Sequence, residues 1–568
     1  RMSKIARMMQ QATAGAGGAG LDVDSLFSTF LYDGGGSQDI TNSIDFSNEG
    51  GMVWIKARDD STSNHLYDTE RGVLKRVTLD TTEEETTDNY SLSAFYNNGF
   101  RVLSDLATIG LNKNNKDYVS WSWRKAENWF DIQTYTGNGS SQTISHNLGC
   151  EVGMMFIKKL TGGTANWMIW HRSLGGANKY LRPNTSPTGT STSRLNNTLP
   201  TSSGFTVGND GDTNSSGANY VCYLFAHNNN DGKFGPSGDQ DIVKCGTYTG
   251  NGSTQDINLG FEPQWIIIKT NSTTGPWYIW DSMRGVVTGG DDWYLRANES
   301  GDEGDANNIK FNSTGFSLEN STVNANAETY VYMAIRRGPL AAPTDATKVF
   351  AMDSNGLSAN SEGVYFTSNF PVDFTIMKER THSSDPWYAM SRLQGSGNYL
   401  DTANTTAESG GISNGTFDHM TGWMQSGSAN MSWMWKRAPG YFDVVAYTGD
   451  FTTSNSIAHN LGVAPEMMWI RRRDAVEAWQ VPVLITSSGY RNMRLDTTYE
   501  GQAISSYSDY TGLKSQPTST NFVLGQNSQT NASGGAFIAY LFATVAGVSK
   551  LGSFSHTYGG TTNVDCGF

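Results

Sequence analysis

The sequence has little charge, few cysteines and no long apolar run. Charged side chains make up 17% of its 568 residues, below the share of about 25% that is usual for a soluble domain. No run of about 18 apolar residues is present, which excludes a transmembrane helix. The four cysteines stand at different places within the repeats described below. A disulfide or zinc framework would reuse its positions, so we expect free buried thiols instead.

The chain is also short of basic residues. Lys and Arg number 40 against 54 Asp and Glu, which gives a net charge of −14. Because phosphate binding needs a surplus of Lys and Arg, this balance argues against a nucleic-acid partner. It favours solubility at high copy number.

No catalytic motif stands out. The sequence contains no Gly-x-Ser-x-Gly elbow, phosphate-binding loop, His-Glu-x-x-His motif or paired Cys-x-x-Cys. His146 and His459 share a position that is asparagine in another copy of the repeat. Asp210, Asp212 and Asn214 have the alternate spacing of a calcium loop but lack its glycine and bidentate glutamate. We therefore expect no enzyme activity, no cofactor and no metal.

What is abundant is glycine, with 63 residues, together with Asn, Ser, Thr and aromatic residues. Trp, Tyr, Val, Ile and Thr favour half-buried strands, whereas Gly and Asn favour turns. The sequence is also repetitive, at an interval of about 100 residues, which is the size of a domain rather than of a solenoid turn. A strand-like run that closes on a basic residue occurs five times, at Met52–Lys56, Met154–Lys158, Trp265–Lys269, Phe374–Lys378 and Met467–Arg471.

Two further phrases mark the ends of a repeat. The opening phrase contains Tyr-Thr-Gly, at Tyr135, Tyr248 and Tyr447. Alternation with period two over six residues predicts a closing strand in every copy. The closing strands are Tyr118–Trp123, Tyr220–Phe225, Tyr330–Ile335, Asn430–Trp435 and Phe537–Phe542.

Many short strands joined by Gly, Asn and Ser turns predict an all-β protein. The expected fold is a tandem array of five β-sandwich domains of jelly-roll type, with a short N-terminal docking segment. The predicted parts are, in order, a docking arm (residues 1–27), repeat 1 (28–129), repeat 2 (130–240), repeat 3 (241–345), repeat 4 (346–440), repeat 5 (441–549) and the start of a truncated sixth repeat (550–568).

The two ends differ from the repeats. Residues 1–27 are too few for a core of their own and are interpreted as an arm that orders on a partner, with Ile5, Met8 and Met9 as its contacts. The arm has too few apolar residues for membrane insertion. Phe554–Phe568 matches the opening phrase of repeat 3, so we expect the natural chain to continue into a sixth repeat.

An aromatic strand lies after the basic residue of repeats 2 and 3. Because successive side chains of a strand face opposite sides, one face is core and the other is available as a platform for sugar rings. Asp281 and Arg284 match Asp68 and Arg71, and such a pair is best interpreted as a structural salt bridge, with a polar ligand contact as the alternative. The candidate ligand contacts are Trp167, Trp170, Trp277, Trp280, Asp281 and Arg284.

Together these phrases resemble an uncharacterised tandem module that is common in structural proteins of marine tailed bacteriophages. The resemblance covers about residues 28–549 and is closest in repeats 1 to 3. It implies a virion protein, a tail fibre or spike that takes part in host attachment, assembled in the host cytoplasm and bound to other virion proteins through residues 1–27. It implies no catalytic or binding residues.

Three alternatives stay open from the sequence. The first is a capsid-bound decoration protein, which is the main competitor to a tail fibre among virion proteins. A carbohydrate-binding array, with host-surface glycan as its partner, is supported by the aromatic strand. A polysaccharide-degrading spike needs paired carboxylates in a groove, and no repeated pair is visible. A homotrimer is expected only by analogy with phage fibres.

Overall fold

The computed structural model describes residues 20–105, 109–183, 189–354, 364–381, 387–412, 415–425, 430–486, 489–497, 501–503, 512–556 and 558–568. Short antiparallel strands are the main regular structure of these residues, which confirms the all-β class. The predicted docking contacts Ile5, Met8 and Met9 lie outside the described residues. No helix in the described ranges is long and apolar enough to cross a membrane.

The contacts within the chain divide it into two compact units. Unit 1 holds the residues up to Arg284 together with Asp292–Ile309 and Gly315–Leu340, and it contains repeats 1 to 3. Unit 2 holds Ala341–Phe568, with repeats 4 and 5, and two short segments of repeat 3. Compactness therefore groups the repeats into two units, and the boundaries between the five repeats stay predictions.

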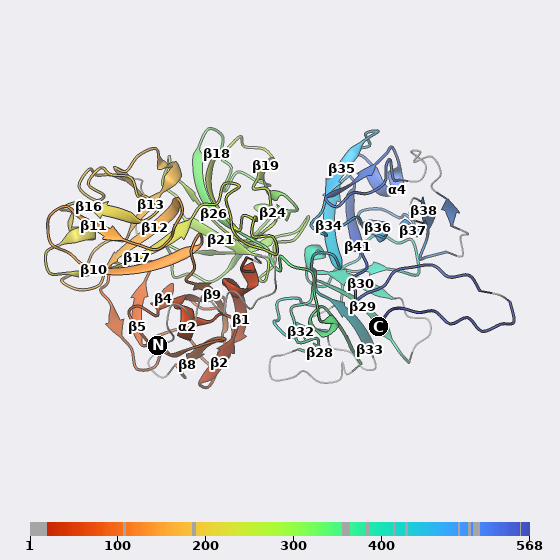
Figure 1. The fold of residues 1–568 in the computed structure, drawn as a ribbon, viewed down its shortest axis with the longest axis horizontal. Coiled ribbons are helices and arrows are strands. Elements are labelled where there is room, and N and C mark those ends of the chain that lie inside the picture. The colour runs from red at the N-terminus through yellow and green to blue at the C-terminus, as the bar shows by residue number, and fades with distance from the viewer. Residues whose placement is uncertain are drawn as a thin grey trace. The chain divides into compact units, whose positions relative to one another are not determined.

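Each repeat in unit 1 has one large and one small antiparallel sheet (Figure 1). In repeat 1 the large sheet has the order β1 (Phe27–Asp33), β9 (Asp117–Arg124), β3 (Gly51–Ala57), β4 (His65–Asp68), β5 (Lys75–Thr78), β6 (Thr86–Thr87), and the small sheet β2 (Gln38–Thr41), β8 (Gly99–Val102), β7 (Leu92–Tyr96). In repeat 2 the orders are β10 (Phe130–Thr136), β17 (Asn219–Ala226), β12 (Val152–Lys159), β13 (Met168–His171), and β11 (Gln142–Ser145), β16 (Gly204–Val207), with the separate pair β14 (Lys179–Tyr180), β15 (Gly189–Thr190). In repeat 3 they are β18 (Val243–Thr249), β26 (Thr329–Arg336), β20 (Pro263–Thr270), β21 (Trp277–Asp281), β22 (Asp292–Arg296), β23 (Gly304–Ala306), and β19 (Gln255–Asn258), β25 (Gly315–Leu318), β24 (Ile309–Asn312).

Unit 2 repeats the same strand order twice. In repeat 4 the large sheet is β27 (Phe350–Asp353), β33 (Asn430–Trp435), β29 (Phe374–Glu379), β30 (Tyr388–Ser391), β31 (Leu400–Asp401), and the small sheet β28 (Phe366–Thr367), β32 (Gly422–Trp423). In repeat 5 they are β34 (Phe442–Thr448), β41 (Ala536–Phe542), β36 (Met467–Arg472), β37 (Val481–Thr486), β38 (Gly489–Met493), β39 (Gln502–Ala503), and β35 (Asn455–Ala458), β40 (Asn521–Leu524). The helices are single turns: η1 (Val23–Ser25), α2 (Phe46–Glu49), η2 (Arg172–Leu174), α3 (Gly211–Asn214), η3 (Ala346–Lys348), η4 (Arg392–Gln394) and α4 (Ser528–Asn531).

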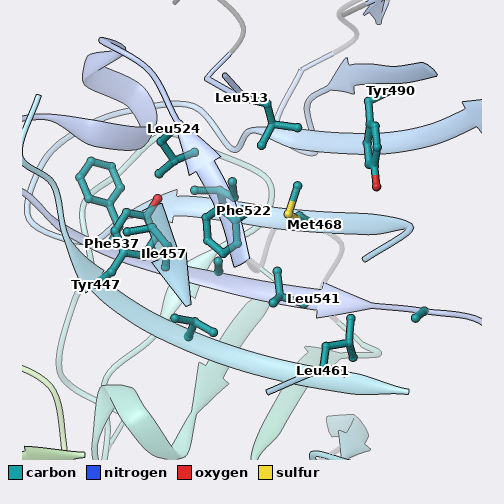
Figure 2. Packing of buried hydrophobic residues seen from close by; sticks show 14 residues of the cluster. Tyr447, Ile457, Leu461, Met468, Tyr490, Leu513, Phe522, Leu524, Phe537 and Leu541 are labelled. Carbon is teal, nitrogen blue, oxygen red and sulfur yellow. The ribbon is translucent and has the colours of Figure 1, made fainter. Parts of the chain in front are cut away.

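The closing strand is the second strand of every large sheet. It lies between the opening strand and the strand that ends on the basic residue, as β9 lies between β1 and β3. Its inner face packs against the small sheet. Figure 2 shows this core in repeat 5, where Leu541 and Met468 of the large sheet lie near Phe522 of the small sheet. Apolar side chains at every second position of β41 thus form the interior of the sandwich.

In unit 1 the outer face of the closing strand is buried as well. Every residue of β17 from Tyr220 to Ala226 is buried, and so is every residue of β9 from Tyr118 to Trp123. A single sandwich covers only one face of each sheet, so the second face must be covered by another repeat. The contacts between repeats therefore decide what the predicted ligand residues do.

Candidate functional site

The six predicted ligand contacts are all buried in unit 1. Trp167 and Trp280 have 0% of their surface exposed, and the other four have 4% or less. An aromatic platform for a sugar ring needs an accessible ring face. The structure therefore does not support ligand contact at these positions and gives them a packing role instead: Trp167 and Trp277 contact another repeat, whereas Trp170 and Trp280 pack within their own repeat.

Asp281 and Arg284 form the structural salt bridge that the sequence predicts. Arg284 Nε donates to Asp281 Oδ2 at 2.7 Å, and both side chains are fully buried. The same pair in repeat 1 joins Arg71 Nε to Asp68 Oδ2 at 2.5 Å. The guanidinium compensates the charge of the buried carboxylate, and its N–H groups match the directions in which the carboxylate oxygens accept hydrogen bonds. Burial by itself lowers the pKa of Arg71, but the charge and the hydrogen bond of Asp68 act together with Tyr223 and Glu85 to outweigh it, so the pKa of Arg71 is raised.

The acidic residue also accepts a hydrogen bond from the closing strand of a different repeat. Tyr223 Oη of repeat 2 donates to Asp68 Oδ2 of repeat 1 at 2.7 Å. Trp121 Nε1 of repeat 1 donates to Asp281 Oδ2 of repeat 3 at 3.0 Å. At the same position in repeat 2, His171 Nε2 lies 3.0 Å from the backbone oxygen of Tyr332 in repeat 3. Repeat 2 thus contacts repeat 1, repeat 3 contacts repeat 2, and repeat 1 contacts repeat 3, which closes a ring of three.

A second set of hydrogen bonds runs around the same ring. Trp167 Nε1 of repeat 2 donates to the backbone oxygen of Thr78 in repeat 1 at 2.8 Å. Trp277 Nε1 of repeat 3 donates to the backbone oxygen of Arg182 in repeat 2 at 3.3 Å. In repeat 1 the amide of Asn64 replaces the indole and donates to the backbone oxygen of Arg296 in repeat 3 at 3.1 Å. Each tryptophan therefore anchors one repeat to the one before it.

Aromatic rings fill the space where the three large sheets meet. The rings of Trp123 and Trp265, from repeats 1 and 3, are perpendicular with centroids 5.6 Å apart. Trp123 also contacts Phe225 of repeat 2 edge-on at 5.9 Å. Such edge-to-face pairs are each worth about 0.5–1.5 kcal/mol beyond the apolar area that they bury. The ring of three is therefore held by an apolar centre and by the two sets of hydrogen bonds around it.

His171 makes this ring sensitive to acid. Burial is the main reason that the pKa of His171 is lowered to about 3; the positive charge of Arg172 acts in the same direction, and the hydrogen bond to Tyr332 acts against it. In the unfolded chain its pKa is about 6.5. The folded state binds the proton more weakly, so the neutral imidazole stabilises the fold above about pH 6.5, and this contribution is lost as the pH falls toward 3.

We expect the His171→Gln variant to lose stability less steeply than the wild type between pH 6.5 and pH 4. One proton that binds only the unfolded state corresponds to a slope of about 1.4 kcal/mol per pH unit. The measurement is the unfolding midpoint of unit 1 across this pH range. The His556→Gln variant is the control because His556 is exposed. Equal slopes for wild type and His171→Gln would contradict the assignment.

In unit 2 the contact between repeats 4 and 5 is made by the same two kinds of hydrogen bond. Tyr540 Oη of repeat 5 donates to Gln394 Oε1 of repeat 4 at 2.8 Å, at the positions that Tyr223 and Arg71 occupy in unit 1. Trp479 Nε1 of repeat 5 donates to the backbone oxygen of Asp401 in repeat 4 at 2.8 Å. Repeat 5 is thus attached to repeat 4 as repeat 2 is attached to repeat 1.

A hollow lies between these two repeats. Its volume is about 330 Å³, and its lining comes from both repeats of unit 2. The lining residues are Ile376, Trp387, Thr402, Ala403, Trp469 and Leu495. Trp387 is 40% exposed, and it stacks on Trp433 with centroids 5.4 Å apart. At this hollow, aromatic residues at repeated positions of repeats 4 and 5 meet solvent.

The other predicted polar positions serve the fold. Asp210 Oδ1 accepts from the backbone nitrogen of Asp212 and caps α3, and Asp212 pairs with Arg194 at 2.5 Å. Within the described ranges, no group of three or more His, Cys, Asp or Glu is placed to hold a metal ion. The prediction of buried free thiols is confirmed for Cys222 and Cys245, but it is wrong for Cys566, which is exposed.

These features define an all-β protein whose repeats bind one another through their closing strands. The chain belongs to the family described as "Domain of unknown function (DUF7483)", whose model matches residues 22–339 and 345–568. The first matched span contains repeats 1 to 3, and the second contains repeats 4 and 5 and the segment that follows them. No curated protein matches the chain.

Sequence reasoning missed the open face around Trp387, Trp433 and Trp469. The signal was present in the closing strands. β17 has no charged residue between Tyr220 and Ala226, and a strand without polar alternation is typical of burial on both faces. β33 has the same lack of charged residues, and in the structure one of its faces is only half-buried.

Proposed function

We propose that the protein is a structural component of a tailed-bacteriophage virion, a tail fibre or spike that projects from the particle and contributes to host attachment. One structural observation supports a scaffold role. The side chains that recur between repeats, such as Asp68 and Asp281 with their partners Tyr223 and Trp121, hold one repeat to the next. The virion assignment itself depends on the resemblance of the repeated phrases to phage structural modules.

Electron microscopy of virions with an antibody against the chain tests this proposal. We expect label on projections of the particle. Label confined to infected cells, with none on purified particles, would contradict it. The number of copies per particle separates a tail fibre, with few copies, from a capsid-bound decoration protein, with many.

A carbohydrate-binding array is the second candidate. The aromatic residues expected to form its platform in repeats 2 and 3 are buried, so its remaining support is Trp387 at the hollow of unit 2. A glycan array probed with the purified chain tests it. Binding that the Trp387→Ala variant loses would support this candidate, and an array without hits would count against it.

A further inference from the structure

The outer faces of the large sheets in repeats 4 and 5 are open, whereas the equivalent faces in unit 1 are covered by another repeat. In β33 buried and half-buried residues alternate strictly, and Met431, Trp433 and Trp435 form the half-buried face. The equivalent residues of β9 are fully buried, and of these Trp121 bonds repeat 3 while Trp123 packs against repeats 2 and 3. In β36, Trp469 is half-buried in the same way, whereas every residue of β3 is buried. The difference lies in the neighbours and not in the strands.

Trp387 shows which neighbour is missing. At its position in the repeat, Trp167, Trp277 and Trp479 each donate an indole hydrogen bond to the preceding repeat around the contact series. Their exposed fractions are 2% or less, compared with 40% for Trp387. Among the described residues, Trp387 Nε1 has no acceptor. In unit 1 each such acceptor belongs to another repeat of the ring, so the same pattern assigns the acceptor of Trp387 to a third repeat beside repeats 4 and 5.

The free surfaces of unit 2 form the two halves of one docking site. Repeat 4 presents its closing strand with Trp433, and repeat 5 presents Trp469 and Leu495 from across the hollow. In unit 1 a single repeat fills the corresponding place, because repeat 3 accepts from Trp121 of repeat 1 and lies beside His171 of repeat 2. An apolar lining with unpaired donors at its edge matches the surface that another repeat buries.

Residues 554–568 carry the opening phrase of such a repeat. In repeat 3, Tyr248 of this phrase stacks on Tyr330 of the closing strand with centroids 5.0 Å apart and is 7% exposed. Phe554, at the matching position, is 66% exposed, and Tyr558 in the turn that follows it is fully exposed. The phrase therefore has no closing strand to pair with among the described residues.

We infer that the open face of unit 2 is the docking site for one further repeat of this same fold, opened by residues 554–568, which closes repeats 4 and 5 into a second ring of three. Its acidic residue would accept the hydrogen bond of Trp433, as Asp281 accepts that of Trp121. Its backbone would accept the hydrogen bond of Trp387, as that of Thr78 accepts from Trp167. A second copy of unit 2 fits less well, because it brings two joined repeats to a place that holds one.

A grafted chain tests the inference. Residues 262–340 of repeat 3 are joined after Phe568, so that the segment 554–568 supplies the opening phrase. Hydroxyl-radical footprinting then measures the solvent accessibility of each tryptophan by mass spectrometry. We expect oxidation of Trp387, Trp433 and Trp469 to fall to the level of Trp167, which is fully buried. A second graft, with residues 45–125 of repeat 1, guards against one graft that fails to fold.

Two matched variants of the grafted chain serve as controls. Trp433→Arg places a charge on the docking face and should restore oxidation of Trp387 and Trp469. Trp293→Arg in the original repeat 3, at a residue that is 41% exposed in unit 1, should leave protection intact. Failure of both grafts to protect the three tryptophans would overturn the inference. So would protection in the ungrafted chain that increases with concentration while its mass in solution doubles, since this assigns the face to a second copy.

Discussion

Replacement of Asp281 by alanine is expected to destabilise unit 1 by about 3 kcal/mol, the usual cost of removing one member of a buried ion pair. The carboxylate accepts from Arg284 Nε within repeat 3 and from Trp121 Nε1 of repeat 1. Arg284 keeps a contact with Glu303 at 3.1 Å, but the indole of Trp121 loses its acceptor in the interior. Chemical unfolding of unit 1, followed by hydrogen exchange in the closing strand β9, measures the loss.

The chain itself offers the controls for Asp281. Asp239→Ala removes an exposed carboxylate and should change stability by less than about 0.5 kcal/mol. The double variant Asp281→His with Arg284→Leu installs the pair found in repeat 2, His171 and Leu174, and should recover part of the loss. An Asp281→Ala variant that unfolds at the wild-type midpoint would show that the contact between repeats 1 and 3 contributes nothing.

The second large effect compares the same position in the two units. Trp121→Ala should cost unit 1 about 3–5 kcal/mol, because the indole is fully buried and its removal leaves a cavity. Trp433→Ala should cost unit 2 clearly less, because Trp433 is half-buried and stacks on the exposed Trp387. Unfolding curves of both variants and of the wild type measure the two losses. Equal losses would mean that the face around Trp433 is covered in solution.

The strands were predictable from the sequence because each repeats a local pattern. The alternation of Tyr118–Trp123 predicts β9, and the run Met52–Lys56 lies within β3 as observed. The Asp281–Arg284 pair was also predictable, because its spacing recurs in repeat 1 and its chemistry allows few other partners.

The contacts between repeats were not predictable in the same way. Asp68, His171 and Asp281 occupy one position, yet one of the three accepts from a phenol, one donates to a backbone oxygen and one accepts from an indole. In all three repeats this position bonds the closing strand of another repeat, but the residue type and the direction of the hydrogen bond differ. A comparison of residue types alone therefore makes the position look variable. Alternation also shows only that a strand has two distinct faces. Whether the second face meets solvent or another repeat depends on residues more than 100 positions away.

The pairing of first and last strands has a consequence for how such chains change length. Phe27 at the start of β1 lies opposite Trp123 near the end of β9, and Phe130 of β10 lies opposite Phe225 of β17. The chain thus enters and leaves each sheet at one edge, a few ångströms apart. A gene that gains or loses one whole repeat joins two points that are already adjacent, and the remaining sheets need no new connection. Gain or loss of a repeat therefore leaves the connections within the remaining sheets intact but changes which closing-strand faces are covered, and we expect related chains to differ in length by whole repeats.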